Sequence, residues 1–206
     1  MVEKKRYLCI KPNRHHTMII ASQKRKENIA EYLLYMWQIE DLIRANNLDI
    51  DQIQQNIIDR YQLDDALKSQ MREWYESLID MMRREGVEKS GHLQLNKNII
   101  IQLVELHQAL LKDPRFAEYT AEFYRTLPYI VELRAKAGES KSGEIETCFN
   151  ALYGMLMLRL QGKEVTPDTQ NAVKQISKFI AVLSKDFHLD EAGKLFNDET
   201  DNAENQ

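Results

Sequence analysis

The chain has 206 residues, of which 43% are apolar and 29% charged, so it holds enough apolar material for one core, and a second compact domain would be cramped. Seven glycines and four prolines are few, which disfavours folds rich in tight turns and favours long helices. The formal net charge of −4 argues against general nucleic-acid binding, because that binding needs a basic surface.

The first residues differ in character from the rest of the chain. Residues 1–17 (MVEKKRYLCIKPNRHHT) are basic and show no sustained apolar period. One explanation is that Met18 is the true start and that the preceding residues are an upstream extension. His15 and His16 are adjacent, but a metal site needs three or four converging ligands, so we predict no metal there.

The cysteines and the apolar runs bear on location. Cys9 and Cys148 have neither metal-like nor redox-like spacing, and the sequence shows no secretion signal, so we expect reduced thiols in the cytoplasm. No stretch approaches the roughly 18 apolar residues that cross a bilayer, so we expect no membrane partner.

After residue 17 the spacing of the apolar residues is that of helices, and no strand pattern competes with it. The predicted helices cover residues 22–46, 49–61, 64–85, 95–112, 114–137, 143–161 and 166–187. Pro128 predicts a kink or break near Thr126. We therefore predict an all-α fold, an up-and-down bundle of about six to seven helices. Its domain spans residues 22–187, between a disordered extension (1–21) and a disordered acidic tail (188–206).

Standard catalytic motifs are absent from the sequence. It contains no phosphate-binding loop, no dinucleotide fingerprint and no Gly-x-Ser-x-Gly elbow. Glu105 and His107 are two positions apart and lie on different faces of a helix, so they do not match a di-iron motif. We accordingly predict no catalytic residue, no metal and no cofactor.

Three polar residues nevertheless lie on apolar helix faces. Glu40 falls inside the arc of the first helix, Arg159 inside that of residues 143–161, and His107 among the apolar residues of 95–112. A buried carboxylate needs a partner or a raised pKa. Either the three side chains form a polar site that lines an internal pocket, or Glu40 and Arg159 form a structural ion pair and His107 is a hydrogen-bonded core histidine.

Aromatic residues raise two further questions. Phe116, Tyr119, Phe123 and Tyr124 recur at helical spacing, which favours core packing over a ligand cavity. The first helix is apolar nearly all round, so it is either central in the bundle or shared with a second subunit. In the second case Tyr35 and Trp37 are the expected interface anchors.

Two stretches, KENIAEYLLYMWQIEDLIRA (Lys26–Ala45) and GEIETCFNALYGMLMLRLQGKEVTPDT (Gly143–Thr169), resemble an uncharacterised family found mainly in Bacteroides-group bacteria. The resemblance runs from about Met18 to His188 and excludes residues 1–17. It implies an all-helical, cytoplasmic bacterial protein with a domain of unknown function. It carries no established activity and therefore no functional residues.

The sequence thus favours a non-enzymatic helical bundle that acts through protein contacts, with a homodimer as one form. The alternative is a bundle that binds or converts a small molecule. In that alternative Glu40 is the charged partner or proton acceptor, Arg159 clamps an anion, and His107 lies nearby.

Overall fold

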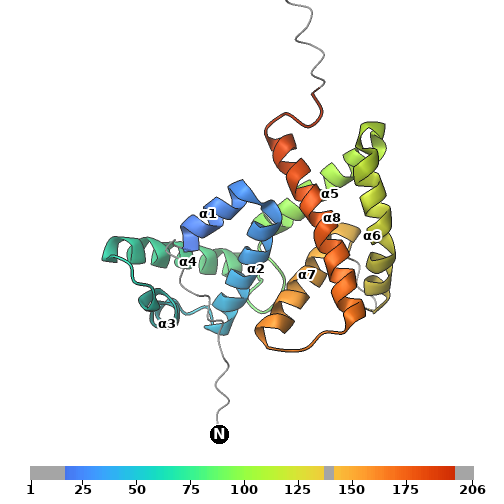
Figure 1. The fold of residues 1–206 in the computed structure, drawn as a ribbon. Coiled ribbons are helices and arrows are strands. Elements are labelled where there is room, and N and C mark those ends of the chain that lie inside the picture. The colour runs from blue at the N-terminus through green and yellow to red at the C-terminus, as the bar shows by residue number, and fades with distance from the viewer. Residues whose placement is uncertain (1–16, 137–141, 198–206) are drawn as a thin grey trace, which may run out of the picture.

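The fold is all-α, as predicted. The computed structural model describes residues 17–136 and 142–197, and within these ranges it holds eight α-helices, two short 3₁₀ helices and no strand (Figure 1). In chain order they are α1 (Thr17–Glu27), α2 (Ile29–Ala45), α3 (Ile50–Asn56), η1 (Ile58–Arg60), α4 (Asp65–Arg84), α5 (Gln94–Lys112), η2 (Pro114–Phe116), α6 (Ala117–Lys136), α7 (Glu144–Leu160) and α8 (Pro167–Glu191).

The predicted first helix is two helices that meet at Asn28. The Asn28 side chain accepts hydrogen bonds from the backbone nitrogens of Ala30 (3.0 Å) and Glu31 (3.1 Å). Its own backbone is extended, with φ −157°. An asparagine that bonds the first free amides of a helix starts that helix afresh, so α1 and α2 are separate elements.

Both predicted domain boundaries need correction. Residues 17–21 belong to α1 and not to an extension, and α8 continues past residue 187 to Glu191. Beyond that end, Leu195 and Phe196 still pack against the core, because they cover its apolar edge. The predictions made for His15, His16 and Cys9 lie outside the described residues.

The break that Pro128 predicts near Thr126 does not occur. Helix α6 runs without interruption from Ala117 to Lys136 and includes this proline. A proline removes one N–H donor and crowds the carbonyl four positions earlier, which belongs to Tyr124. Tyr124 is 61% exposed, so the affected turn lies on the solvent side of the helix and the packed side is undisturbed.

Two hydrophobic clusters make up the interior, and α2 contributes to both. Leu33 and Trp37 of α2 pack with α5, α6, α7 and α8. Met36, Ile39 and Ile43 of the same helix pack with α1, α3 and α4. Figure 1 shows α2 between these two groups of helices. The all-round apolar character of this helix therefore reflects a central position.

Candidate functional site

Glu40 is fully buried, as its position on the wheel predicts. Its Oε1 accepts hydrogen bonds from the backbone nitrogen of Leu93 (2.9 Å) and from Asn96 Nδ2 (2.6 Å), and its Oε2 lies 2.6 Å from His92 Nδ1. All three partners belong to the short segment that leads into α5 or to its first turn. The buried carboxylate is thus satisfied by groups 52 to 56 positions later in the chain.

These contacts explain what a carboxylate does in the core. Helix α5 begins after Leu93, which offers no side-chain cap, and its first turn holds no acidic residue. Glu40 brings a negative charge to this positive helix end from another helix. Glu85 acts similarly, since its Oε2 accepts a 2.6 Å hydrogen bond from the backbone nitrogen of Gln94. Two carboxylates from elsewhere in the chain therefore cap α5.

The imidazole of His92 is held on two sides by α2. Its ring stacks on Trp37 with centroids 4.0 Å apart and planes inclined by 12°. Trp37 precedes Glu40 by one helical turn, so a single face of α2 provides both the stacking surface and the hydrogen bond. Tyr153 packs edge-on against Trp37 and donates a 2.6 Å hydrogen bond to Asp41. Trp37 therefore contacts both the imidazole of His92 and the ring of Tyr153.

The predicted pair of Glu40 and Arg159 is wrong. Arg159 is exposed in the last turn of α7, next to Leu160, which is 42% exposed. The wheel angle of Arg159 is apolar, but among the described residues no helix buries this end of α7. The structural alternative is therefore right about Glu40 being held in the core and wrong about the partner.

His107 does not join Glu40 either. It lies eleven residues beyond Asn96 on α5, about 16 Å away at the helical rise. It is 3% exposed, and its Nδ1 lies 2.7 Å from the Tyr119 hydroxyl. Phe123 and Phe179 flank the ring with centroids 4.7 and 5.9 Å away. This burial lowers the pKa of His107, and His107 is a hydrogen-bonded core histidine.

Tyr35 and Trp37 are not available as interface anchors. They are 8% and 2% exposed, because the chain's own helices cover them. Of the predicted aromatic stripe, Tyr119 and Phe123 are buried in the core, and Phe116 of η2 is half-buried and packs against it. Tyr124 is the exception, since it faces solvent.

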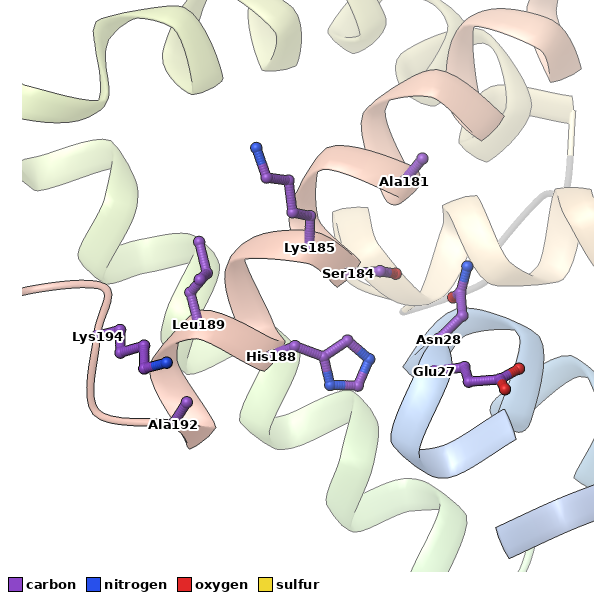
Figure 2. Close-up of a pocket in the computed structure, with 9 residues that line it drawn as sticks. All are labelled: Glu27, Asn28, Ala181, Ser184, Lys185, His188, Leu189, Ala192 and Lys194. Carbon is purple, nitrogen blue, oxygen red and sulfur yellow. The ribbon is translucent and has the colours of Figure 1, made fainter. Parts of the chain in front are cut away.

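A different place combines a surface groove with buried polar atoms that have no partner. The groove has a volume of about 370 Å³ and lies between α8 and the corner where α1 meets α2 (Figure 2). Ser184, His188, Glu27 and Asn28 are among its lining residues. Ser184 Oγ and His188 Nε2 are both buried and have no hydrogen-bond partner among the described residues.

The two unpartnered residues are one helical turn apart on α8, so their side chains project from the same face. Figure 2 shows both pointing toward the corner of α1 and α2, where Asn28 and Glu27 lie. His188 Nδ1 lies 3.5 Å from Glu191, which also forms a 2.8 Å ion pair with Arg25 of α1. The Nδ1 side of the imidazole therefore faces Glu191, and Nε2 lies on the other side of the ring.

Other kinds of site find no support in the described part of the chain. No group of three or more histidine, cysteine, aspartate or glutamate side chains is placed to hold a metal ion there. In the same residues no helix is both long enough and apolar enough to cross a bilayer.

The comparisons with known proteins give a family and no activity. Residues 18–194 match the family described as Domain of unknown function (DUF4924). The chain belongs to this family. No curated protein and no solved structure matches the chain. Membership of DUF4924 therefore assigns no role to any residue of the chain, and the candidate site is argued from its geometry alone.

Sequence reasoning missed the partners of Glu40 and the polar pair of α8. His92 and Asn96 lie at a helix start, where the apolar period gives no information about which side chains turn inward. Ser184 carries a usable signal, because it lies four positions after buried Ile180 and so on the apolar arc of α8. His188 lies just after residue 187, where the sequence predicts a disordered tail, so the apolar spacing gives no sign of the polar pair that it makes up with Ser184.

Proposed function

We propose that this protein is a non-catalytic helical protein that binds a small polar molecule in the groove of Figure 2. The observation that supports the proposal is the pair of buried, unpartnered polar atoms, Ser184 Oγ and His188 Nε2, on one face of α8. A buried polar group without a partner costs about 1–3 kcal/mol, and native folds hold few of them. A ligand that pairs with both atoms offsets this cost.

The groove favours binding over hydrolysis. A serine nucleophile needs a hydrogen bond to its general base, and Ser184 makes none to His188 although the two are one turn apart. Neither polar atom contacts solvent, so a ligand reaches them by displacing a covering side chain.

We also propose where the protein is located in the cell and whether it forms a dimer. The family resemblance supports a cytoplasmic protein of Bacteroides-group bacteria. A homodimer stays a prediction. Its interface cannot use Tyr35 and Trp37 as anchors, because both side chains are buried within the protein. Light scattering of the full chain at micromolar concentration tests it, and a monomeric mass would remove it.

The binding proposal is tested by a thermal-shift and NMR screen of small polar compounds on the full chain. We expect a stabilising compound whose effect is lost in Ser184→Ala. The matched control is Ser77→Ala, which removes an exposed hydroxyl from α4 and should bind as the wild type does. The proposal fails if no compound binds, or if every compound that binds does so equally well to Ser184→Ala.

A further inference from the structure

We propose that the ligand is a small zwitterion that carries an ammonium and a carboxylate group, such as a free amino acid or a dipeptide. This inference rests on the proposed function of the groove and names the chemical class of its ligand. Three features of the groove support it: the separation of its charges, the hydrogen-bonding character of its buried atoms, and its size.

The charges that line the groove are separated by sign. Glu27 projects from the end of α1, whereas Lys185 and Lys194 come from α8 and the residues after it. In Figure 2 Lys194 lies on the opposite side of His188 from Glu27, and the Lys185 side chain projects away from His188. A ligand with a single charge meets attraction at one side and repulsion at the other. A dipolar ligand aligned across the groove is attracted at both.

The buried atoms call for a donor in the middle of the groove. His188 Nδ1 lies 3.5 Å from Glu191, and in the tautomer whose Nδ1–H faces that carboxylate, Nε2 presents a lone pair that accepts a hydrogen bond. The Ser184 hydroxyl either donates or accepts. An ammonium group has three N–H donors, so it can donate to both His188 Nε2 and Ser184 Oγ, which project from the same face of α8. A phosphate or a simple carboxylic acid anion has no such donor.

The volume of the groove limits the length of the ligand. About 370 Å³ is near the lower end of the range for small-molecule sites, roughly 300–1,000 Å³. The apolar lining includes Ala181, Leu189 and Ala192, which suits a short aliphatic side chain. Glu27 also accepts a 2.7 Å hydrogen bond from Gln23, and an ammonium competes with that contact. Because the charges at the rim are exposed and screened by salt, we expect weak, salt-sensitive binding.

The test measures binding to the full chain by NMR titration at low ionic strength. The probes are the free proteinogenic amino acids and Ala-Ala, followed by the N-acetyl and the amide derivative of the tightest binder. We expect each derivative to bind about tenfold more weakly than its parent, since each lacks one charged pole. Glu27→Gln should weaken the parent by a similar factor and leave the N-acetyl derivative unchanged. Lys194→Gln should weaken the parent and leave the amide unchanged.

Matched controls are Glu164→Gln and Lys163→Gln, which remove exposed charges from the residues between α7 and α8. The zwitterion class is overturned if no probe binds, or if either derivative binds as tightly as its parent. Neutral polyols separate this failure from failure of the groove itself. If a polyol binds in a Ser184-dependent manner while the amino acids do not, the binding function survives and the ligand class falls. If neither kind binds, both fall.

Discussion

Glu40 Oε1 and the backbone nitrogen of Leu93 are joined by a 2.9 Å hydrogen bond across 53 positions of sequence. Leu93 belongs to the cluster of α1 to α4, whereas Ile99, in the second turn of α5, belongs to the other cluster. The bond therefore lies where the chain crosses from one cluster to the other. By capping α5, Glu40 fixes the start of a helix that carries the second cluster.

We expect Glu40→Ala to lower the free energy of unfolding by about 3 kcal/mol or more. The change leaves the Leu93 amide and the Asn96 side chain without their shared acceptor, and buried donors that lose a charged partner are costly. Urea unfolding followed by circular dichroism measures the difference. Arg159→Gln is the control, and we expect a change within about 0.5 kcal/mol because its side chain is exposed. Equal losses in the two variants would contradict the assignment.

Trp37→Ala should lower the free energy of unfolding by about 3–5 kcal/mol, the usual cost of truncating a buried tryptophan. The loss includes the stacking surface for His92. If Trp37 were instead a dimer anchor, the variant would remain well folded and become monomeric. Unfolding midpoints and light scattering on the same samples distinguish the two outcomes. Tyr124→Ala removes an aromatic ring that is 61% exposed, and we expect little change from it.

The sequence predicted well what depends on the helical period. The all-α class and the burial of Glu40 follow from the spacing of apolar residues, because a buried face imposes that spacing. The same spacing left open whether α2 is central in the bundle or shared with a second subunit. The sequence predictions failed where the burial of a residue depends on which other helix covers it. Arg159 has the right wheel angle, but the end of α7 extends beyond the core. His92 turns inward from a segment that has no period at all.

The two polar sites differ in how far the sequence could locate them. The helical wheel predicts that Glu40 is buried but does not predict its partners. His92 and Asn96 contact Glu40 because of how the chain folds at the start of α5. Ser184 lies on the arc of α8 and is detectable in the same way. That its hydroxyl lacks a partner is a tertiary property, because it depends on the corner formed by α1 and α2.

The stability of the protein should fall with pH below about 6.5 through His107. Burial lowers the pKa of this imidazole, opposed in part by the charge of Glu144. Between the lowered pKa and the ordinary value of about 6.5, the unfolded chain binds a proton that the folded chain excludes. The contribution of His107 to the free energy of unfolding is therefore fully present above about pH 6.5. It is lost as the pH falls below that value, by at most about 1.4 kcal/mol per pH unit.

Unfolding free energies measured from pH 8 to pH 5 test this contribution. His107→Gln keeps a hydrogen-bonding group near the Tyr119 hydroxyl and removes the titration. We expect a shallower pH dependence for this variant than for the wild type. Identical slopes for the two proteins would show that His107 does not bind a proton differently in the two states.

Two buried hydroxyls on neighbouring helices should respond to removal in opposite directions. Ser184 Oγ has no partner among the described residues, so Ser184→Ala relieves an unsatisfied group and should raise the free energy of unfolding by about 1 kcal/mol. Thr126 Oγ1 donates to the Glu122 carbonyl at 2.8 Å and accepts from Gln175 at 3.1 Å. Thr126→Val keeps the shape, loses both bonds, and should cost about 1 kcal/mol or more. Thermal unfolding of both variants measures the difference. If Ser184→Ala is destabilising to the same extent, its hydroxyl has a partner in solution, and the groove loses the observation on which its function rests.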